Sequence, residues 1–341
     1  MRTTRFLISI LFVTISISAI GQSLRLAQFD KRLELTAIAY RLTSEYEANN
    51  YAYSAYAADV DKHFNQLKNH PLIAFLADKS SNTDLASLCE IALHLNIDHQ
   101  QIKLDDAARF EHSNRAFCMQ YVSLLQDFYN SSDFEKFYNA HSHYYSAAEK
   151  VYNDIINAID TKVINEMLKT DLTNVSILLN SFSGAYSYTF PRDKAIVLSG
   201  FADCSVGNAK SKHLGCNVPC GEKKIVYLLA ELELQSTLHA LTPSVLEAST
   251  KYFEASTSNY FKPHALYGEY YKQLLAVYYL QRSKHPMAQI EVRMSEGGQD
   301  QLLLPLFSSL LPKFAELLDQ GYAVDIVPKF AKIYSQQAPT R

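Results

Sequence analysis

The chain has 341 residues and a formal net charge of −3, with no run of Lys and Arg, which argues against a nucleic acid as its partner. Its length suffices for one large domain or two small ones. After the first 21 residues, no apolar stretch is long enough to suggest a membrane span.

The first 21 residues have the pattern of a cleavable export signal. Arg2 and Arg5 precede an apolar stretch of about fifteen residues, which is short for a bilayer span. Small residues, Ala19 and Gly21, occupy the two positions that a signal peptidase reads, so we expect cleavage before Gln22. Loss of the two arginines changes the net charge from −3 to about −5. We therefore expect a periplasmic or secreted protein that contacts a membrane only through its uncleaved signal peptide.

The next part of the chain has helical spacing of its apolar residues. Asp84–Leu95 and Asn114–Tyr129 each place them on one helix face. Ser132 and Glu135 have the spacing of a capping box that opens a long helix. On that helix His141 is expected to be a core residue. It points away from the histidine two positions later, so the two cannot share a metal ion.

A small β element follows the helices. Val175–Leu179 and Ala195–Leu198 are short β-type runs, and the residues between them indicate turns and a short hairpin. Helical patterns then return. We predict a mainly α fold with a small β element. The expected divisions are a signal peptide (1–21) and one domain (22–341), made of a helical part (about 31–170), the β element (about 173–200), a motif helix (about 223–241) and C-terminal helices (244–335).

Five cysteines are present in a chain that we expect to enter an oxidising compartment, where disulfides persist. Cys204, Cys216 and Cys220 lie in one polar, glycine-bearing segment, and we predict at least one disulfide among them. With His213 they could also form a zinc site, but the spacing matches no common zinc module. The other two cysteines lie in apolar helical patterns and either pair or stay buried as thiols (Cys89 and Cys118).

The motif helix has a face that changes from apolar to polar. Four aliphatic residues share this face, and one turn further it continues with Gln235, Ser236 and His239. His239 can contact both others, because side chains three or four positions apart meet on a helix. These residues indicate either a core histidine with satisfied nitrogens or the remnant of a metal site.

Several segments along the chain point to a family. They are Asp59–Phe64, Lys68–Pro71, Leu93–Leu95, Asp127–Tyr138, Leu178–Ser181 and Ala265–Gly268. In these segments the chain resembles a family of exported Bacteroidetes proteins, a domain of unknown function with zincin-type metallopeptidase character. The resemblance extends over most of the mature chain and implies a zincin-like fold.

Such families resemble gluzincins, in which HExxH on a helix supplies two zinc ligands and a general base. The corresponding stretch here is Gln235-Ser236-Thr237-Leu238-His239, in which only the last residue matches. No His in the chain is followed by Glu, and no two His are four positions apart. A later helix usually supplies a third ligand, and Glu269 is the available carboxylate. On this later helix Glu269 points away from the face that carries the apolar residues, so we expect its side chain to be solvated.

The expected function follows from this degenerate motif. An amide is a poor zinc ligand and a serine cannot replace a carboxylate base, so we expect no metal, no cofactor and no catalytic residue. The hypothesis is an exported, inactive homologue of a zinc metallopeptidase-like family that binds an unknown peptide or protein. One alternative is an active hydrolase with a rearranged site around His239. Another is a structural or glycan-binding protein of the envelope, since the many tyrosines suit glycan or peptide recognition.

Overall fold

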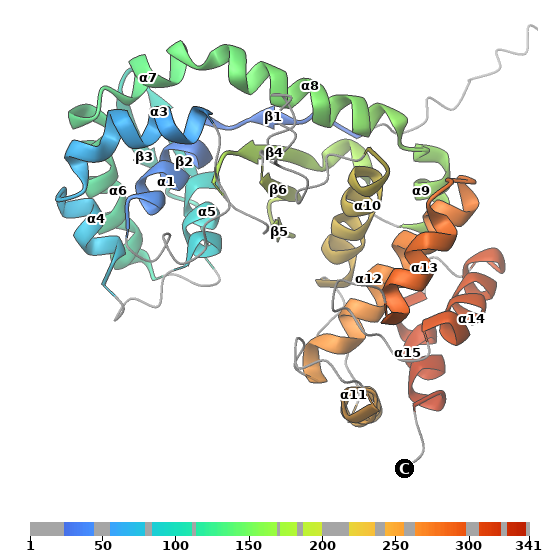
Figure 1. Cartoon of the computed structure of the whole chain (residues 1–341). Helices are drawn as coiled ribbons and strands as arrows, with labels where there is room; N and C mark the ends of the chain where they lie inside the picture. Colours follow the sequence, from blue (N-terminus) through green and yellow to red (C-terminus); the bar gives the residue numbers. More distant parts are fainter. Residues whose placement is uncertain are drawn as a thin grey trace, which may run out of the picture.

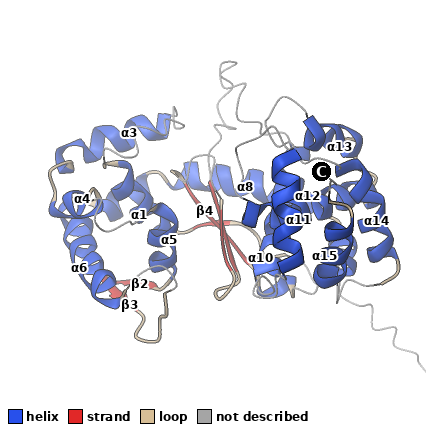
Figure 2. Ribbon diagram, turned by 90° about the horizontal axis from the view of Figure 1, so that it is seen from below, coloured by secondary structure: helices blue, strands red, loops and turns tan. Residues whose placement is uncertain are grey.

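The protein is mainly helical, with a small sheet between two groups of helices (Figures 1 and 2). The long helix α8 (Ser142–Ala158) passes over the sheet from the N-terminal group toward the C-terminal group. This confirms the predicted mainly α class with a small β element. The computed structural model describes residues 24–43, 55–78, 84–110, 114–168, 171–182, 187–199, 218–235, 243–255, 263–297, 307–321 and 326–338. The expected signal peptide lies outside these residues.

The N-terminal group is built around α1 (Lys31–Arg41). The carboxylate of Asp30 caps this helix by accepting from the backbone N–H groups of Arg32 and Leu33. Every residue from Leu33 to Ala39 is buried, as expected for a helix surrounded by other elements. The other helices of this part are α3 (Ala55–Phe64), α4 (Pro71–Leu76), α5 (Leu85–Leu93), α6 (Arg115–Ser131) and α7 (Phe134–Ala140), with a 3-10 turn at Asn65–Leu67. After α8, helix α9 (Thr161–Met167) packs against the C-terminal group, and a 3-10 turn at Leu172–Asn174 leads into the sheet (Figure 1).

A β-hairpin interrupts the part that the sequence predicts as helical. Its strands, β2 (Leu95–Asp98) and β3 (Gln101–Leu104), are antiparallel and follow α5 directly. The two-residue turn consists of His99 and Gln100, with φ of 45° and 65°. Positive φ at both turn positions defines a type I′ turn, which normally carries Asn or Gly. The prediction of helix here is wrong because this turn lacks the residues that usually mark a hairpin.

The predicted capping box is also absent. Ser132 Oγ donates to the Tyr129 carbonyl at 3.3 Å, and Glu135 pairs with Lys31 at 2.9 Å. Neither side chain is therefore available as a reciprocal cap. The residue before α7 is instead Asp133, which has left-handed φ and ψ of 50° and 34° and makes no side-chain cap. The predicted long helix is divided into α7 and α8, with His141 between them.

Among the described residues, the sheet has four strands in the order β1-β4-β6-β5. The two predicted β runs are confirmed as β4 (Ser176–Asn180) and β6 (Ala195–Ser199), which pair in parallel. The predicted hairpin is formed by β5 (Tyr188–Phe190), which pairs antiparallel with β6. β1 (Gln28–Phe29) pairs in parallel with β4. Two residues are too few to show the alternation of apolar and polar side chains that marks a strand, so the sequence does not predict β1.

The C-terminal group is built around α12 (Pro263–Arg282), which packs against all its other helices. Its core is rich in tyrosine, and six such rings have less than 2% exposure: Tyr252, Tyr267, Tyr270, Tyr271, Tyr279 and Tyr334. These tyrosines are packing residues. No helix in the described part is both long and apolar enough to cross a membrane. The surrounding helices are α10 (Val218–Gln235), α11 (Pro243–Ala255), α13 (Ala288–Gly297), α14 (Phe307–Asp319) and α15 (Ile326–Gln336).

Candidate functional site

The last turn of α10 lies beside the edge strand β5, and it carries the first of the predicted motif residues. Gln235 Nε2 donates to Thr189 Oγ1 of β5 at 3.2 Å. The side-chain amide of Gln235 is thus committed to the sheet. Ser236 and His239 lie outside the described residues. Of the three vestigial motif positions, only Gln235 can be placed.

Glu269 on α12 is buried rather than solvated, which corrects the prediction from sequence. Only 5% of the residue is exposed. Its carboxylate accepts from Tyr227 Oη at 2.6 Å and from Gln273 Nε2 at 3.1 Å, and it lies 3.3 Å from Lys272 Nζ. The prediction of a solvated side chain assumes that only one face of α12 is buried, whereas α12 is enclosed by neighbouring helices. Glu269 therefore joins α10 to α12 and is fully engaged in that role.

The described residues near α10 do not form a metal-binding constellation. Within the described ranges, no three His, Cys, Asp or Glu side chains are grouped so that they could hold a metal ion. Gln235 and Glu269, the two ligand candidates that can be placed, are each bonded to protein groups. These contacts hold α10, β5 and α12 together.

The cysteine predictions divide into those that the structure describes and those that it does not. Cys89 and Cys118 are buried free thiols, one of the two alternatives expected for them. Burial raises the pKa of both thiols, that of Cys118 to about 11. Cys204 and Cys216 lie outside the described residues, and for Cys220 only the backbone is described. The disulfide among these three stays a prediction.

A buried carboxyl group that sequence reasoning missed lies next to the carboxyl end of β4. Glu34, on α1, is 0% exposed. Tyr56 Oη donates to its Oε1 at 2.6 Å, and the backbone N–H of Ser181 donates to its Oε2 at 2.8 Å. The Tyr56 hydroxyl lies 2.8 Å from that of Tyr145 on α8. One carboxyl group thus links α1, α3, α8 and the chain after β4.

Glu34 has an unusual proton affinity for a glutamate. Desolvation raises its pKa to about 7, although the hydrogen bonds from Tyr56 and Ser181 act to lower it. The carboxyl ends of parallel strands are common ligand sites in open α/β sheets. Here the polar group at that edge is covered by helices, so we assign it to the core. In the sequence, this buried carboxyl group is marked by one charged residue, Glu34, within an apolar helical run.

The histidines of the family-like segments also have protein partners. These contacts are His63 Nε2 to the Ser132 carbonyl at 2.8 Å, His70 Nε2 to Asp127 at 3.2 Å, and His94 Nε2 to Asp193 at 3.5 Å. His141, which the sequence predicts to be a core residue, is 17% exposed in its side chain, and its Nδ1 lies 2.8 Å from the Phe137 carbonyl. All four rings are thus engaged with other groups of the protein.

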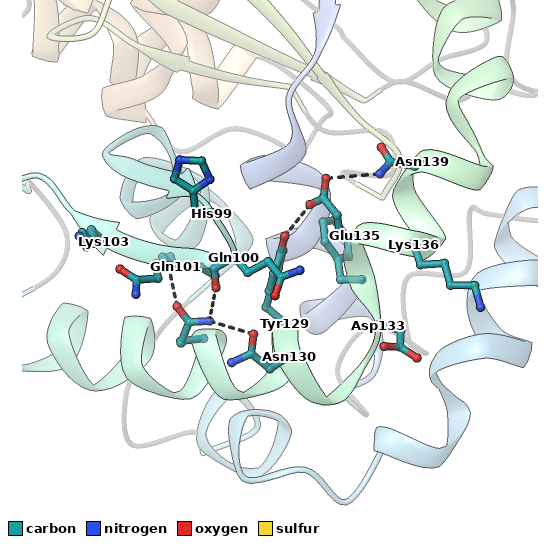
Figure 3. Close-up of a pocket in the computed structure, with 13 residues that line it drawn as sticks. His99, Gln100, Gln101, Lys103, Tyr129, Asn130, Asp133, Glu135, Lys136 and Asn139 are labelled. Atoms are coloured by element: carbon teal, nitrogen blue, oxygen red, sulfur yellow. Dashed lines mark hydrogen bonds between the residues drawn. The ribbon is translucent and has the colours of Figure 1, made fainter.

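An open hollow of about 880 Å³ lies in the N-terminal group, between the hairpin turn and the junction of α6 and α7 (Figure 3). Its lining is mostly polar and includes five carboxamide side chains. Gln126 holds one wall in place, because it accepts from Ile102 N at 2.6 Å and donates to the Gln100 carbonyl at 2.9 Å. The carboxamides are Gln100, Gln101, Gln126, Asn130 and Asn139.

Glu135 forms the charged centre of the opposite wall (Figure 3). Tyr129 Oη donates to Glu135 Oε2 at 2.5 Å, and Lys31 Nζ lies 2.9 Å from the same oxygen. Desolvation acts to raise the pKa of Glu135, but the bonds from Tyr129 and Lys31 outweigh it and lower the pKa. Glu135 therefore stays ionised and paired. The residues of this hollow are scattered over three elements, which is why sequence spacing does not reveal it.

Comparison of the chain with models of known families, with curated proteins and with solved structures gives no match. The family resemblance and the zincin-like fold stay predictions.

Proposed function

We propose that this chain is an exported, non-catalytic homologue of a zincin-type metallopeptidase that binds a peptide or protein partner. The observation that carries the proposal is the bond of 3.2 Å between Gln235 Nε2 and Thr189 Oγ1. At the motif position where a zincin would have its first zinc-binding histidine, this chain has a neutral amide tied to the sheet. One imidazole, that of His239, cannot replace the three protein ligands of a catalytic zinc.

The arrangement around α10 supports the peptide-binding part of the proposal. β5 is one of the two edge strands of the described sheet, the other being β1, and it runs antiparallel to its neighbour β6. Edge strands can take up an extended peptide as an additional strand. Binding at this edge would use main-chain hydrogen bonds, which need neither a metal nor a general base.

Metal analysis of a rebuilt motif tests the proposal. The purified protein, equilibrated with zinc and desalted, is expected to retain no stoichiometric zinc and to leave casein uncleaved. The double variant Gln235→His/Ser236→Glu recreates HExxH, which supplies two of the three ligands of a catalytic zinc, and is expected to bind zinc more tightly than the unaltered protein. The matched control Gln235→Ala/Ser236→Ala has the same two positions changed and should show no such increase.

Two outcomes would overturn the proposal. One zinc in the unaltered protein that is lost in His239→Ala would favour a hydrolase with a rearranged site. A rebuilt motif that binds no zinc in a folded protein would mean that α10 does not present these positions as a zincin helix does.

Binding of a peptide partner is tested with a library of displayed random peptides. Failure of every peptide to bind the folded protein would contradict peptide recognition.

A further inference from the structure

A second feature, independent of the proposed function, concerns the hollow between the hairpin turn and the α6–α7 junction. We propose that this hollow is a binding site for a neutral oligosaccharide. Its volume of about 880 Å³ lies within the range of small-molecule sites in proteins.

The lining offers the hydrogen-bonding groups that hydroxyl-bearing ligands need. A carboxamide can donate and accept hydrogen bonds, and so can a sugar hydroxyl. A carboxamide can therefore bind a sugar hydroxyl as donor, as acceptor or as both. Gln101, Asn130 and Asn139 come from three different elements and are all exposed. In Figure 3 they lie around the hollow, together with Gln100 at the turn.

The hollow has charges of both signs and no cluster of one sign. Lys103 and Lys136 lie in the lining together with Asp133 and Glu135, and Glu135 is paired with Lys31, so the lining does not select strongly for an anion or a cation. The apolar lining residues are almost completely buried, Ile102 at 6% exposure and Phe134 at 0%. These two side chains therefore offer little surface to a lipid or an apolar peptide side chain. A neutral ligand with many hydroxyl groups fits these constraints.

The backbone around the hollow is held in costly conformations. Five non-glycine residues among those described have positive φ, and three of them line this hollow: His99, Gln100 and Asp133. Left-handed backbone costs an ordinary residue about 1–2 kcal/mol, and such strain concentrates at functional sites. Gln126 fixes the turn in this shape, so the wall is organised before any ligand arrives.

Saturation-transfer NMR and titration calorimetry on the purified protein test the proposal, with cellotetraose, N-acetylchitotetraose, maltotetraose and mannotetraose as probes. At least one is expected to bind. The double variant Gln101→Ala/Asn139→Ala is expected to weaken that binding tenfold or more. The matched control Gln289→Ala/Asn157→Ala removes one exposed Gln and one exposed Asn elsewhere and should leave the affinity unchanged.

If the first variant does not fold, as judged by circular dichroism, Asn130→Ala provides the same test from α6. The proposal is overturned if none of the four oligosaccharides binds, or if the binding survives both variants. It is also overturned if a random peptide mixture or a polyphosphate competes for the site better than any sugar. The zinc measurements on the rebuilt motif are unaffected by each of these outcomes, so the two proposals fail separately.

Discussion

At the scale of single residues, Glu34 shows how a carboxyl group can belong to a core. Its two oxygens face two donors, Tyr56 Oη and Ser181 N–H, so each oxygen of the ionised form accepts a hydrogen bond. The protonated form is also accommodated, because it can donate to the Tyr56 hydroxyl while that hydroxyl donates to Tyr145. Complete burial favours the protonated form and raises the pKa to about 7. The group therefore titrates within the folded state close to neutral pH.

We expect Glu34→Gln to remove this titration while keeping the hydrogen bonds of the protonated form. A raised folded pKa means that the stabilisation is fully present below the unfolded value of 4.5 and is lost as the pH rises through about 7. The variant should therefore gain up to about 3 kcal/mol relative to the natural protein between pH 4.5 and pH 8. Urea unfolding of both proteins across that range measures it. A constant difference, or one that falls with pH, would show that Glu34 does not titrate as described.

At the scale of elements, the hairpin turn has an energetic cost that can be measured. We expect Gln100→Gly to stabilise the fold by about 0.5–1 kcal/mol, because glycine removes the cost of φ at 65° but adds freedom to the unfolded chain. The control is Gln101→Gly in β3, which should destabilise by a similar amount, because φ is negative there and only the entropy term acts. Equal destabilisation in both variants, measured by urea unfolding, would mean that the turn is not strained.

The same scale shows which elements could be predicted from sequence. β4 and β6 are continuous apolar runs bounded by turn signals, so a local pattern suffices to find them. The hairpin β2–β3 carries the unusual turn residues His99 and Gln100, so local propensity misleads. The two-residue β1 exists only through its pairing with β4. For the candidate site, the motif helix can be predicted from its local pattern, whereas the burial of Glu269 depends on helices that are distant in the sequence.

At the scale of the whole molecule, two enclosed helices organise the architecture. α1 is the centre of the N-terminal group and α12 the centre of the C-terminal group, and the sheet lies between these groups (Figure 2). α8 contacts both groups, because it packs on α7 of the N-terminal group and on α10 of the C-terminal group. It contacts α10 at Gly221, where a Cβ atom would lie 2.6 Å from Ile155 Cδ1. This contact connects the two groups and depends on the absence of a side chain.

Gly221→Ala is therefore expected to destabilise the protein by about 1–3 kcal/mol through overpacking against Ile155, even though alanine is ordinarily the better helix former. Ile155→Val removes Cδ1, the atom at 2.6 Å, so the double variant should cost less than the sum of the two single changes. Gly268→Ala is the matched control, since its Cβ would meet only Leu234 Cδ2, at 3.1 Å within the C-terminal group, and its effect should be smaller. Thermal and urea unfolding provide the free energies. Stabilisation by Gly221→Ala, or strict additivity with Ile155→Val, would show that α8 and α10 do not pack in the way that joins the two halves of the molecule.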